Sequence, residues 1–233
     1  MIKHIERESF SRTTFRYASQ EEDRNILQEM GMDPENVEEI LFFLDARDKT
    51  SSLKSLLDKP FELKSQLAPK PLRFSDDTIR PAIVLTVPGL PRPTRFSDGT
   101  IPVFYSALEP ETAEVETFAW YAKYALRNAS QERTAYYQRI ACDFQGDVKD
   151  LRPHLQTLPC LIQDEAEGYP DCNRIGIEAF GEGIYGLLTP SARKLEGTCL
   201  PVFRREALSN PQSQALVAFK FDPSSGKTSI LAG

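Results

Sequence analysis

The sequence contains little histidine and cysteine, and this scarcity limits the chemistry that the protein can perform. Two histidines, His4 and His154, and four cysteines occur in 233 residues, and no two cysteines form a Cys-x-x-Cys pair. Structural zinc sites use closely spaced thiolate or imidazole pairs, so no metal site is expected. Hydrolases of the Ser-His-Asp or Cys-His type are disfavoured as well. Any catalysis is therefore expected to use carboxylates, arginines and hydroxyls.

Further absences bear on binding partners and location. The sequence lacks an apolar run of about 18 residues, so no membrane-spanning helix is expected. Its formal net charge is -6, whereas a protein that binds nucleic acid by itself needs a basic surface. The first ten residues are charged and include no apolar segment, which excludes an ordinary secretory signal. A cytoplasmic site of action is expected, with delivery into another cell left open.

The length of the chain, together with 14 Phe and 8 Tyr, is enough for a single domain over residues 1–233 with a hydrophobic core. The first sixty residues are predicted to be helical, with Ser19 as a helix cap and residues 20–60 as a helical insertion. Nine of the 17 prolines fall between Pro60 and Pro110, where long helices are disfavoured.

The rest of the chain mixes helices and strands. Helices are predicted at residues 111–128, with Val115, Phe118, Ala119, Ala122 and Leu126 at helical spacing, and at 171–180. Strands are predicted at 82–87, 101–107, 134–144, 184–188, 198–203, 215–221 and 228–231. Alternation places Tyr136, Ile140, Cys142 and Phe144 on one side of the 134–144 strand. Helices followed by strands without regular alternation predict an α+β fold with a mostly antiparallel sheet.

One stretch combines an arginine, an aromatic residue and a carboxylate in a suggestive order. It runs from Arg95 in a Gly-containing loop, through a strand that ends at Tyr105, to Glu116 in the second turn of the following helix. A part-buried carboxylate needs a partner or a function. Taken alone, Glu116 is more often a surface acid. The sequence around Arg95, Arg-Phe-Ser-Asp, also occurs at Arg73.

This stretch resembles the RES domain, a family whose members are mostly bacterial toxins of RES–Xre toxin–antitoxin pairs. Arg95, Tyr105 and Glu116 follow the order of the family motif. A second block, from Gly183 through Pro-Ser191-Ala-Arg193 to Phe203, is similar to the family's Pro-Ser-x-Arg segment. The best-matched core is 93–208. Thr-Phe-Arg16-Tyr resembles the first-strand arginine of these domains, and Arg73 is the alternative for that position.

The resemblance implies an ADP-ribosyltransferase-like fold and an enzyme that takes NAD as its substrate and needs no cofactor. Glu116, Ser191 and Arg95 are then the expected catalytic residues. Arg16, Arg95, Tyr105 and Ser191 are the expected NAD-binding residues. Arg193 is interpreted as a salt-bridge or surface arginine, and Tyr17, Tyr185 and Trp120 as core or pocket wall.

The function that the resemblance favours is an NAD-degrading toxin, with water or phosphate as the acceptor. A mono-ADP-ribosyltransferase that modifies a protein is the close alternative, and a non-catalytic ADP-ribose-binding protein is an alternative of another class. An antitoxin, an immunity protein or a second copy of the chain is expected to bind. The docking surface is expected either on the N-terminal helices or around Arg73 to Arg95, where six Lys/Arg face four Asp/Glu between 61 and 100.

Overall fold

The structure is a computed structural model that describes residues 1–19, 93–128, 133–163 and 165–232. The helical insertion at 20–60, the strand at 82–87 and Arg73 lie outside the described residues. The strands are β1 (Arg7–Ser19), β2 (Pro93–Thr94), β3 (Ser97–Asp98), β4 (Phe104–Ala107), β5 (Arg133–Asp150), β6 (Gly186–Pro190), β7 (Thr198–Val202), β8 (Leu208–Asp222) and β9 (Lys227–Ala232). The α-helices are α5 (Pro110–Asn128) and α6 (Glu165–Gly181), and short 3-10 helices span Arg152–His154, Pro159–Leu161 and Arg205–Ala207.

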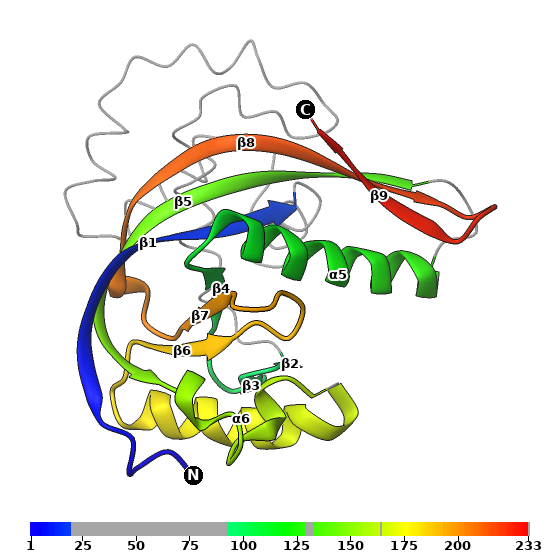
Figure 1. The fold of residues 1–233 in the computed structure, drawn as a ribbon. Helices are drawn as coiled ribbons and strands as arrows, with labels where there is room; N and C mark the ends of the chain where they lie inside the picture. The colour runs from blue at the N-terminus through cyan, green and yellow to red at the C-terminus, as the bar shows by residue number, and fades with distance from the viewer. Residues whose placement is uncertain (20–92, 129–132, 164, 233) are drawn as a thin grey trace.

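The main sheet has seven strands in the order β1-β4-β7-β6-β5-β8-β9, and β1 also pairs with β5. Because β1 pairs with both β4 and β5, these strands and β6 and β7 close into a ring. Among the described strands, β5 and β6 form the one parallel pair. Figure 1 shows β1, β5 and β8 as long curved strands, with α5 beneath their upper part and α6 beyond β6. The α+β class and the mostly antiparallel sheet predicted from the sequence are confirmed.

The start of the chain departs from the prediction. Residues 7–19, which were predicted to be part of a helical region, form β1 and pair with β5 along their whole length. Ser19, expected as a helix cap, is the last residue of this strand. The first half of β1 is mostly exposed and polar. This half is therefore stabilised by its backbone pairing with β5. Such pairing does not require alternating apolar residues, so the sequence shows no strand pattern here.

Helix α5 matches its predicted range, but its buried face differs from the predicted row. Ala113, Tyr121 and Ala125 are buried against β8 residues such as Phe219. Leu126 is 60% exposed. The inward face of α5 also lines a cavity, so it carries polar residues such as Glu116 and Thr117 next to the apolar ones. Tyr136 of β5 is 45% exposed, while Ile140, Cys142 and Phe144 are buried. A register shift after Arg139 in the pairing of β5 with β8 interrupts the predicted alternation.

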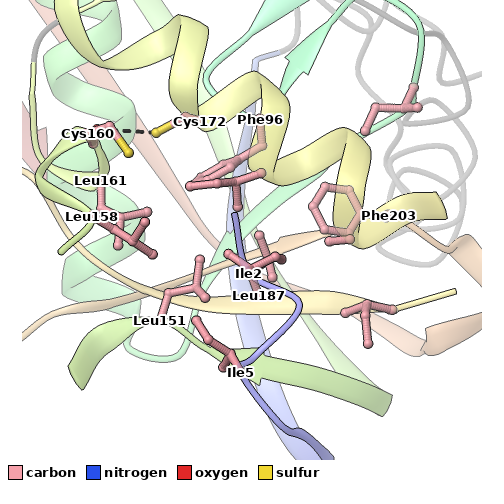
Figure 2. Packing of buried hydrophobic residues seen from close by; sticks show 14 residues of the cluster. Ile2, Ile5, Phe96, Leu151, Leu158, Cys160, Leu161, Cys172, Leu187 and Phe203 are labelled. Atoms are coloured by element: carbon pink, nitrogen blue, oxygen red, sulfur yellow. Dashed lines mark hydrogen bonds between the residues drawn. The ribbon is translucent and has the colours of Figure 1, made fainter. Parts of the chain in front are cut away.

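Helix α6 begins at Glu165 rather than at 171, and Pro170 lies inside it. It packs on a hydrophobic cluster that joins the N-terminal residues, β6 and the loop after β3. Figure 2 shows Phe96 beside α6, together with Cys160 and Cys172, whose thiol donates a hydrogen bond to the Cys160 carbonyl oxygen at 3.2 Å. Gly176 allows the close approach, because a Cβ atom there would lie 1.9 Å from the Phe96 carbonyl oxygen. This contact fixes the β2–β3 hairpin on α6.

Gly176→Ala is expected to destabilise the protein by about 1–3 kcal/mol, because overpacking forces the hairpin and the helix apart. The free energy of unfolding in urea measures this loss. Gly181→Ala in the same helix is the matched control, since no atom lies within 4 Å of its added Cβ. Equal stability of the two variants would show that the hairpin does not depend on this contact.

Candidate functional site

A cavity of about 660 Å³ opens between α5, the ends of β1 and β4, the β2–β3 hairpin and the loop that joins β6 to β7. Four of the predicted site residues line it: Arg16, Arg95, Tyr105 and Glu116. Ser191 is not among its lining residues, although Pro190 and Ala192 are. The structure therefore gathers these four residues, which are up to 100 positions apart in the sequence, around one space.

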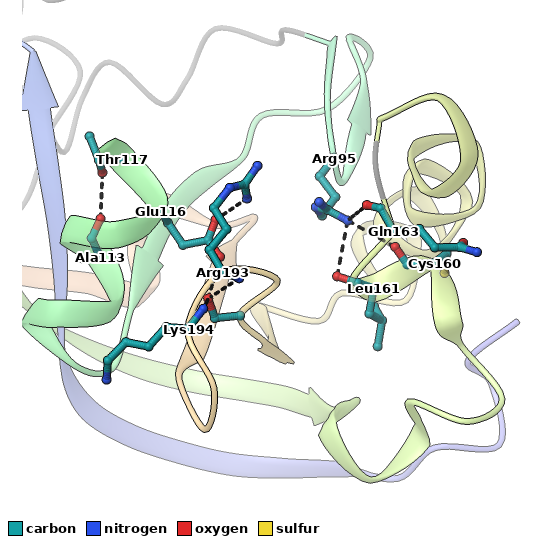
Figure 3. A network of polar contacts seen from close by, with 10 residues as sticks. Arg95, Ala113, Glu116, Thr117, Cys160, Leu161, Gln163, Arg193 and Lys194 are labelled. Carbon is teal, nitrogen blue, oxygen red and sulfur yellow. Dashed lines mark hydrogen bonds and ion pairs between the residues drawn. The ribbon is translucent and has the colours of Figure 1, made fainter. Parts of the chain in front are cut away.

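Glu116 is held at both of its carboxylate oxygens. Ser191 Oγ donates a hydrogen bond to Oε1 at 2.6 Å, and Arg193 Nη1 lies 2.5 Å from Oε2. The side chains of Glu116 and Arg193 are 22% and 27% exposed. Figure 3 shows this pair on α5 and the β6–β7 loop, with Arg95 on the other side of the view. Charge-assisted bonds on both oxygens fix the carboxylate in one orientation at the cavity wall.

Ser191 organises the turn that follows β6. Its Oγ accepts hydrogen bonds from the backbone N–H groups of Arg193 at 3.1 Å and Lys194 at 3.0 Å. Its hydroxyl proton is directed to Glu116. The described contacts therefore place Ser191 behind the carboxylate, where it positions Glu116 and the loop.

Arg95 is fixed by the hairpin and by the segment before α6. Its Nη1 donates to the carbonyl oxygens of Cys160, Leu161 and Gln163 at 3.1, 3.3 and 3.0 Å. Its guanidinium lies over the ring of Tyr169, 4.8 Å from the ring centre. All three carbonyls accept from Nη1, so they do not engage the Nη2 and Nε edge of the guanidinium.

The hairpin itself is tied to α6 and to β4. Asn173 Nδ2 donates to the carbonyl oxygens of Thr94 and Arg95 at 2.6 and 2.8 Å. The Tyr105 hydroxyl donates to Thr94 Oγ1 at 2.8 Å and accepts from the Phe96 N–H at 2.9 Å. Burial raises the pKa of Tyr105, so this hydroxyl keeps its proton at neutral pH. Tyr105 thus uses its hydroxyl to hold the hairpin.

Arg16 enters the cavity from β1. Its Nη1 donates to the Tyr105 carbonyl oxygen at 3.2 Å, and its guanidinium lies 5.0 Å from the centre of the Phe104 ring. Its Nε is buried and has no hydrogen-bond partner among the described residues. A buried donor without a partner is energetically costly.

Aromatic residues line the wall farther along α5, as predicted for Tyr17 and Trp120. The Tyr17 hydroxyl donates to Glu114 Oε2 at 3.0 Å. Burial and the neighbouring Glu114 raise the pKa of Tyr17 to about 12. Trp120 is 47% exposed.

A thiol also reaches the cavity. Cys199 of β7 is one of the lining residues. Burial first, and then the negative charge of Glu116, raise the pKa of this thiol. The thiol is therefore protonated at neutral pH and is a poor nucleophile.

Sequence reasoning missed part of this arrangement. Arg193 does form a salt bridge, as interpreted, but its partner is Glu116 and it lines the cavity. Tyr169 and Asn173, which position Arg95 and its hairpin, were not singled out as site residues. The Pro-Ser-x-Arg spacing was the available signal for Arg193, because it places the arginine two residues after Ser191.

Two further features bear on ligands. The described residues include no group of three His, Cys, Asp or Glu side chains placed to hold a metal ion. None of the described helices has the length and apolar character needed to cross a membrane.

Comparison with known proteins places the chain in a family. The RES domain family model matches residues 71–222. The chain belongs to the RES domain family. The matched range contains the predicted site residues Arg95, Tyr105, Glu116 and Ser191, and it also includes Arg73 but not Arg16. β1, which carries Arg16, is nevertheless part of the same sheet as the RES core.

Among solved structures, a toxin–antitoxin complex is similar to this RES chain. It is the crystal structure of the M. tuberculosis MbcT–MbcA toxin–antitoxin complex, with 16% sequence identity and a TM-score of 0.42. The alignment covers 94% of this chain and 89% of that chain. No curated protein matches the chain.

Tyr105→Phe is expected to destabilise the hairpin while keeping the ring in the cavity. The change removes the acceptor of the Phe96 N–H and the donor to Thr94, at a cost of about 1–3 kcal/mol. Denaturation in urea measures the loss, and faster hydrogen exchange at the Phe96 amide locates it. Tyr136→Phe, at an exposed position of β5, is the control. Unchanged exchange at Phe96 would contradict the anchoring role.

Proposed function

We propose that this RES-family protein is an NAD-degrading toxin that breaks the bond between nicotinamide and ribose. The main supporting observation is the Glu116 carboxylate, fixed at the wall of a cavity that also contains Arg16 and Arg95. The cavity volume of about 660 Å³ falls within the range of about 300–1,000 Å³ that small-molecule sites occupy. Membership of the RES family supports the same reaction.

The reaction needs few catalytic groups. The bond between ribose C1 and the pyridinium nitrogen breaks, and its electron pair goes to the nitrogen, so nicotinamide leaves as a neutral molecule. The leaving group requires no proton from a general acid, which suits a cavity without histidine among its lining residues. The ribose passes through an oxocarbenium-like transition state, as in glycoside cleavage. The Glu116 carboxylate accepts a hydrogen bond from a ribose hydroxyl, and its negative charge stabilises the positive charge that develops on the ribose.

The remaining cavity residues bind the rest of the dinucleotide. Arg16 and the Nη2 and Nε edge of Arg95 hold the diphosphate, since a planar guanidinium suits two phosphate oxygens at once. The ring of Tyr105 contacts the cationic pyridinium, which an aromatic face attracts. Ser191 acts through Glu116 rather than on NAD itself.

The acceptor completes the reaction at ribose C1. With water, its oxygen bonds to C1 and its proton goes to solvent, giving ADP-ribose. With inorganic phosphate, the product is ADP-ribose 1-phosphate. A protein side chain would give a modified protein instead. Mass spectrometry of the products, with and without phosphate, distinguishes these three outcomes.

A protein that consumes NAD harms the cell that makes it. The proposed function therefore requires a partner that inhibits the enzyme. We expect an antitoxin or immunity protein that covers the cavity and excludes NAD. The site of action is the cytoplasm, where NAD supplies redox chemistry. Expression of the wild type without its partner is expected to lower cellular NAD and stop growth.

Glu116→Gln should lower the rate of nicotinamide release from NAD by about 10²-fold or more, because it removes charge that acts mainly in the transition state. Release by the purified protein is measured by liquid chromatography, and circular dichroism checks the fold. Glu111→Gln, an exposed change in the first turn of the same helix, is the matched control. Wild-type turnover in Glu116→Gln, or no release by the wild type, would overturn this mechanism.

Arg16→Ala and Arg95→Ala should each lower kcat/KM for NAD about tenfold or more, because each removes a charged hydrogen-bond donor to phosphate. Arg95→Lys should restore little, since an ammonium lacks the planar fork. Values of kcat/KM for NAD measure these effects. Arg12→Ala, on the exposed part of β1, is the control, and Arg73→Ala is expected to be nearly silent. Loss of activity in Arg73→Ala with an active Arg16→Ala would assign the first arginine to position 73.

A further inference from the structure

The ion pair between Glu116 and Arg193 has a consequence for which substrates the site accepts. A guanidinium 2.5 Å from Oε2 neutralises much of the negative charge that the carboxylate presents. That charge is what an oxocarbenium-like transition state requires. With Arg193 in place, Glu116 is well oriented but electrostatically weak.

The three cavity arginines are anchored differently. Arg16 and Arg95 are bound to backbone carbonyl oxygens and lie over aromatic rings. Within the part of the chain that the structure describes, the Arg193 guanidinium is bound to the Glu116 carboxylate. It lines the same cavity as the other two. The Arg193 guanidinium can therefore leave Glu116 and bind a ligand without breaking a hydrogen bond to a backbone carbonyl.

The loop that carries Arg193 can stay in place during such a transfer. The Arg193 and Lys194 N–H groups donate to Ser191 Oγ, the Ser191 N–H donates to the Gly197 carbonyl at 2.8 Å, and the Gly197 N–H donates to the Lys194 carbonyl at 3.1 Å. These bonds involve the backbone and Ser191, not the guanidinium. Rotation of the Arg193 side chain alone would release Oε2 of Glu116, while Ser191 would still hold Oε1.

We propose that Arg193 is a specificity-determining counter-ion that passes from Glu116 to a phosphate group of the bound substrate. The proposal rests on the NAD-cleaving function above. A diphosphate competes for the guanidinium because it carries two negative charges and accepts bidentate hydrogen bonds. The substrate thereby frees Oε2 for its own ribose hydroxyl. The site then prefers phosphate-bearing nicotinamide nucleotides to nicotinamide riboside, which has the same scissile bond but no phosphate.

The first test compares the two substrates in Arg193→Met. The value of kcat/KM for NAD should fall about tenfold, because a charged phosphate contact is lost. The value for nicotinamide riboside should rise at least about threefold, because Glu116 keeps its full charge. Arg193→Gln serves as a second variant should Arg193→Met fold poorly, and Arg174→Met, an exposed arginine paired with Asp171 on α6, is the matched control.

A change of opposite sign for the two substrates is what a merely structural role cannot produce. Equal losses on both substrates, with an unchanged preference for NAD, would overturn the counter-ion exchange while leaving NAD cleavage intact. If the wild type releases no nicotinamide from NAD, the proposed function itself fails.

The second test measures binding without catalysis, by calorimetric titration with ADP-ribose. Glu116→Gln removes the competitor for Arg193, so ADP-ribose should bind about threefold more tightly than to the wild type. Adding Arg193→Met to Glu116→Gln should cancel that gain, as in a double-mutant cycle between coupled residues. Additive effects of the two substitutions would contradict the exchange.

Discussion

The pairing of β5 with β1 along one edge, and with β6 and β8 along the other, determines where every cavity residue lies. It bends the sheet into a ring, so β4 and the β6–β7 loop come close to the end of β1. Arg16, Tyr105 and Arg193 thus reach one space from three parts of the ring. Helix α5 adds Glu116 from the side, and α6 fixes the hairpin of Arg95 through Gly176 and Asn173.

The charges in the cavity follow from partial burial. A carboxylate that is 22% exposed needs hydrogen-bond donors, and Ser191 and Arg193 supply them. The arginines are likewise satisfied by carbonyl oxygens and ring faces, except for the buried Nε of Arg16. These contacts hold the charged groups of the cavity in place. In the proposed mechanism, the ion pair of Glu116 with Arg193 also sets how strongly Glu116 stabilises a cationic sugar.

The sequence predicted the motif residues and most strands, because these leave local signals. Arg95, Tyr105 and Glu116 lie within one short stretch, and β7 and β9 show compact apolar runs. The residue pattern placed β1 in a helical region, because a mostly exposed strand is stabilised by backbone hydrogen bonds that no side-chain pattern reveals. Only the family resemblance placed Arg16 in a first strand, which the structure confirms. The partner of Arg193 could not be predicted, since Glu116 is 77 residues away and meets it only after the ring closes. Gly176 likewise shows its importance only when Phe96 lies against it.

In the proposed mechanism, the cavity binds NAD with its scissile ribose at Glu116. A crystal structure of Glu116→Gln with NAD tests this directly, because the substitution slows cleavage and keeps the shape of the side chain. We expect a ribose hydroxyl within hydrogen-bond distance of residue 116, the diphosphate on Arg16 and Arg95, and the Arg193 guanidinium turned toward a phosphate. NAD bound elsewhere, or bound with its ribose far from residue 116, would show that Glu116 does not act on the scissile bond.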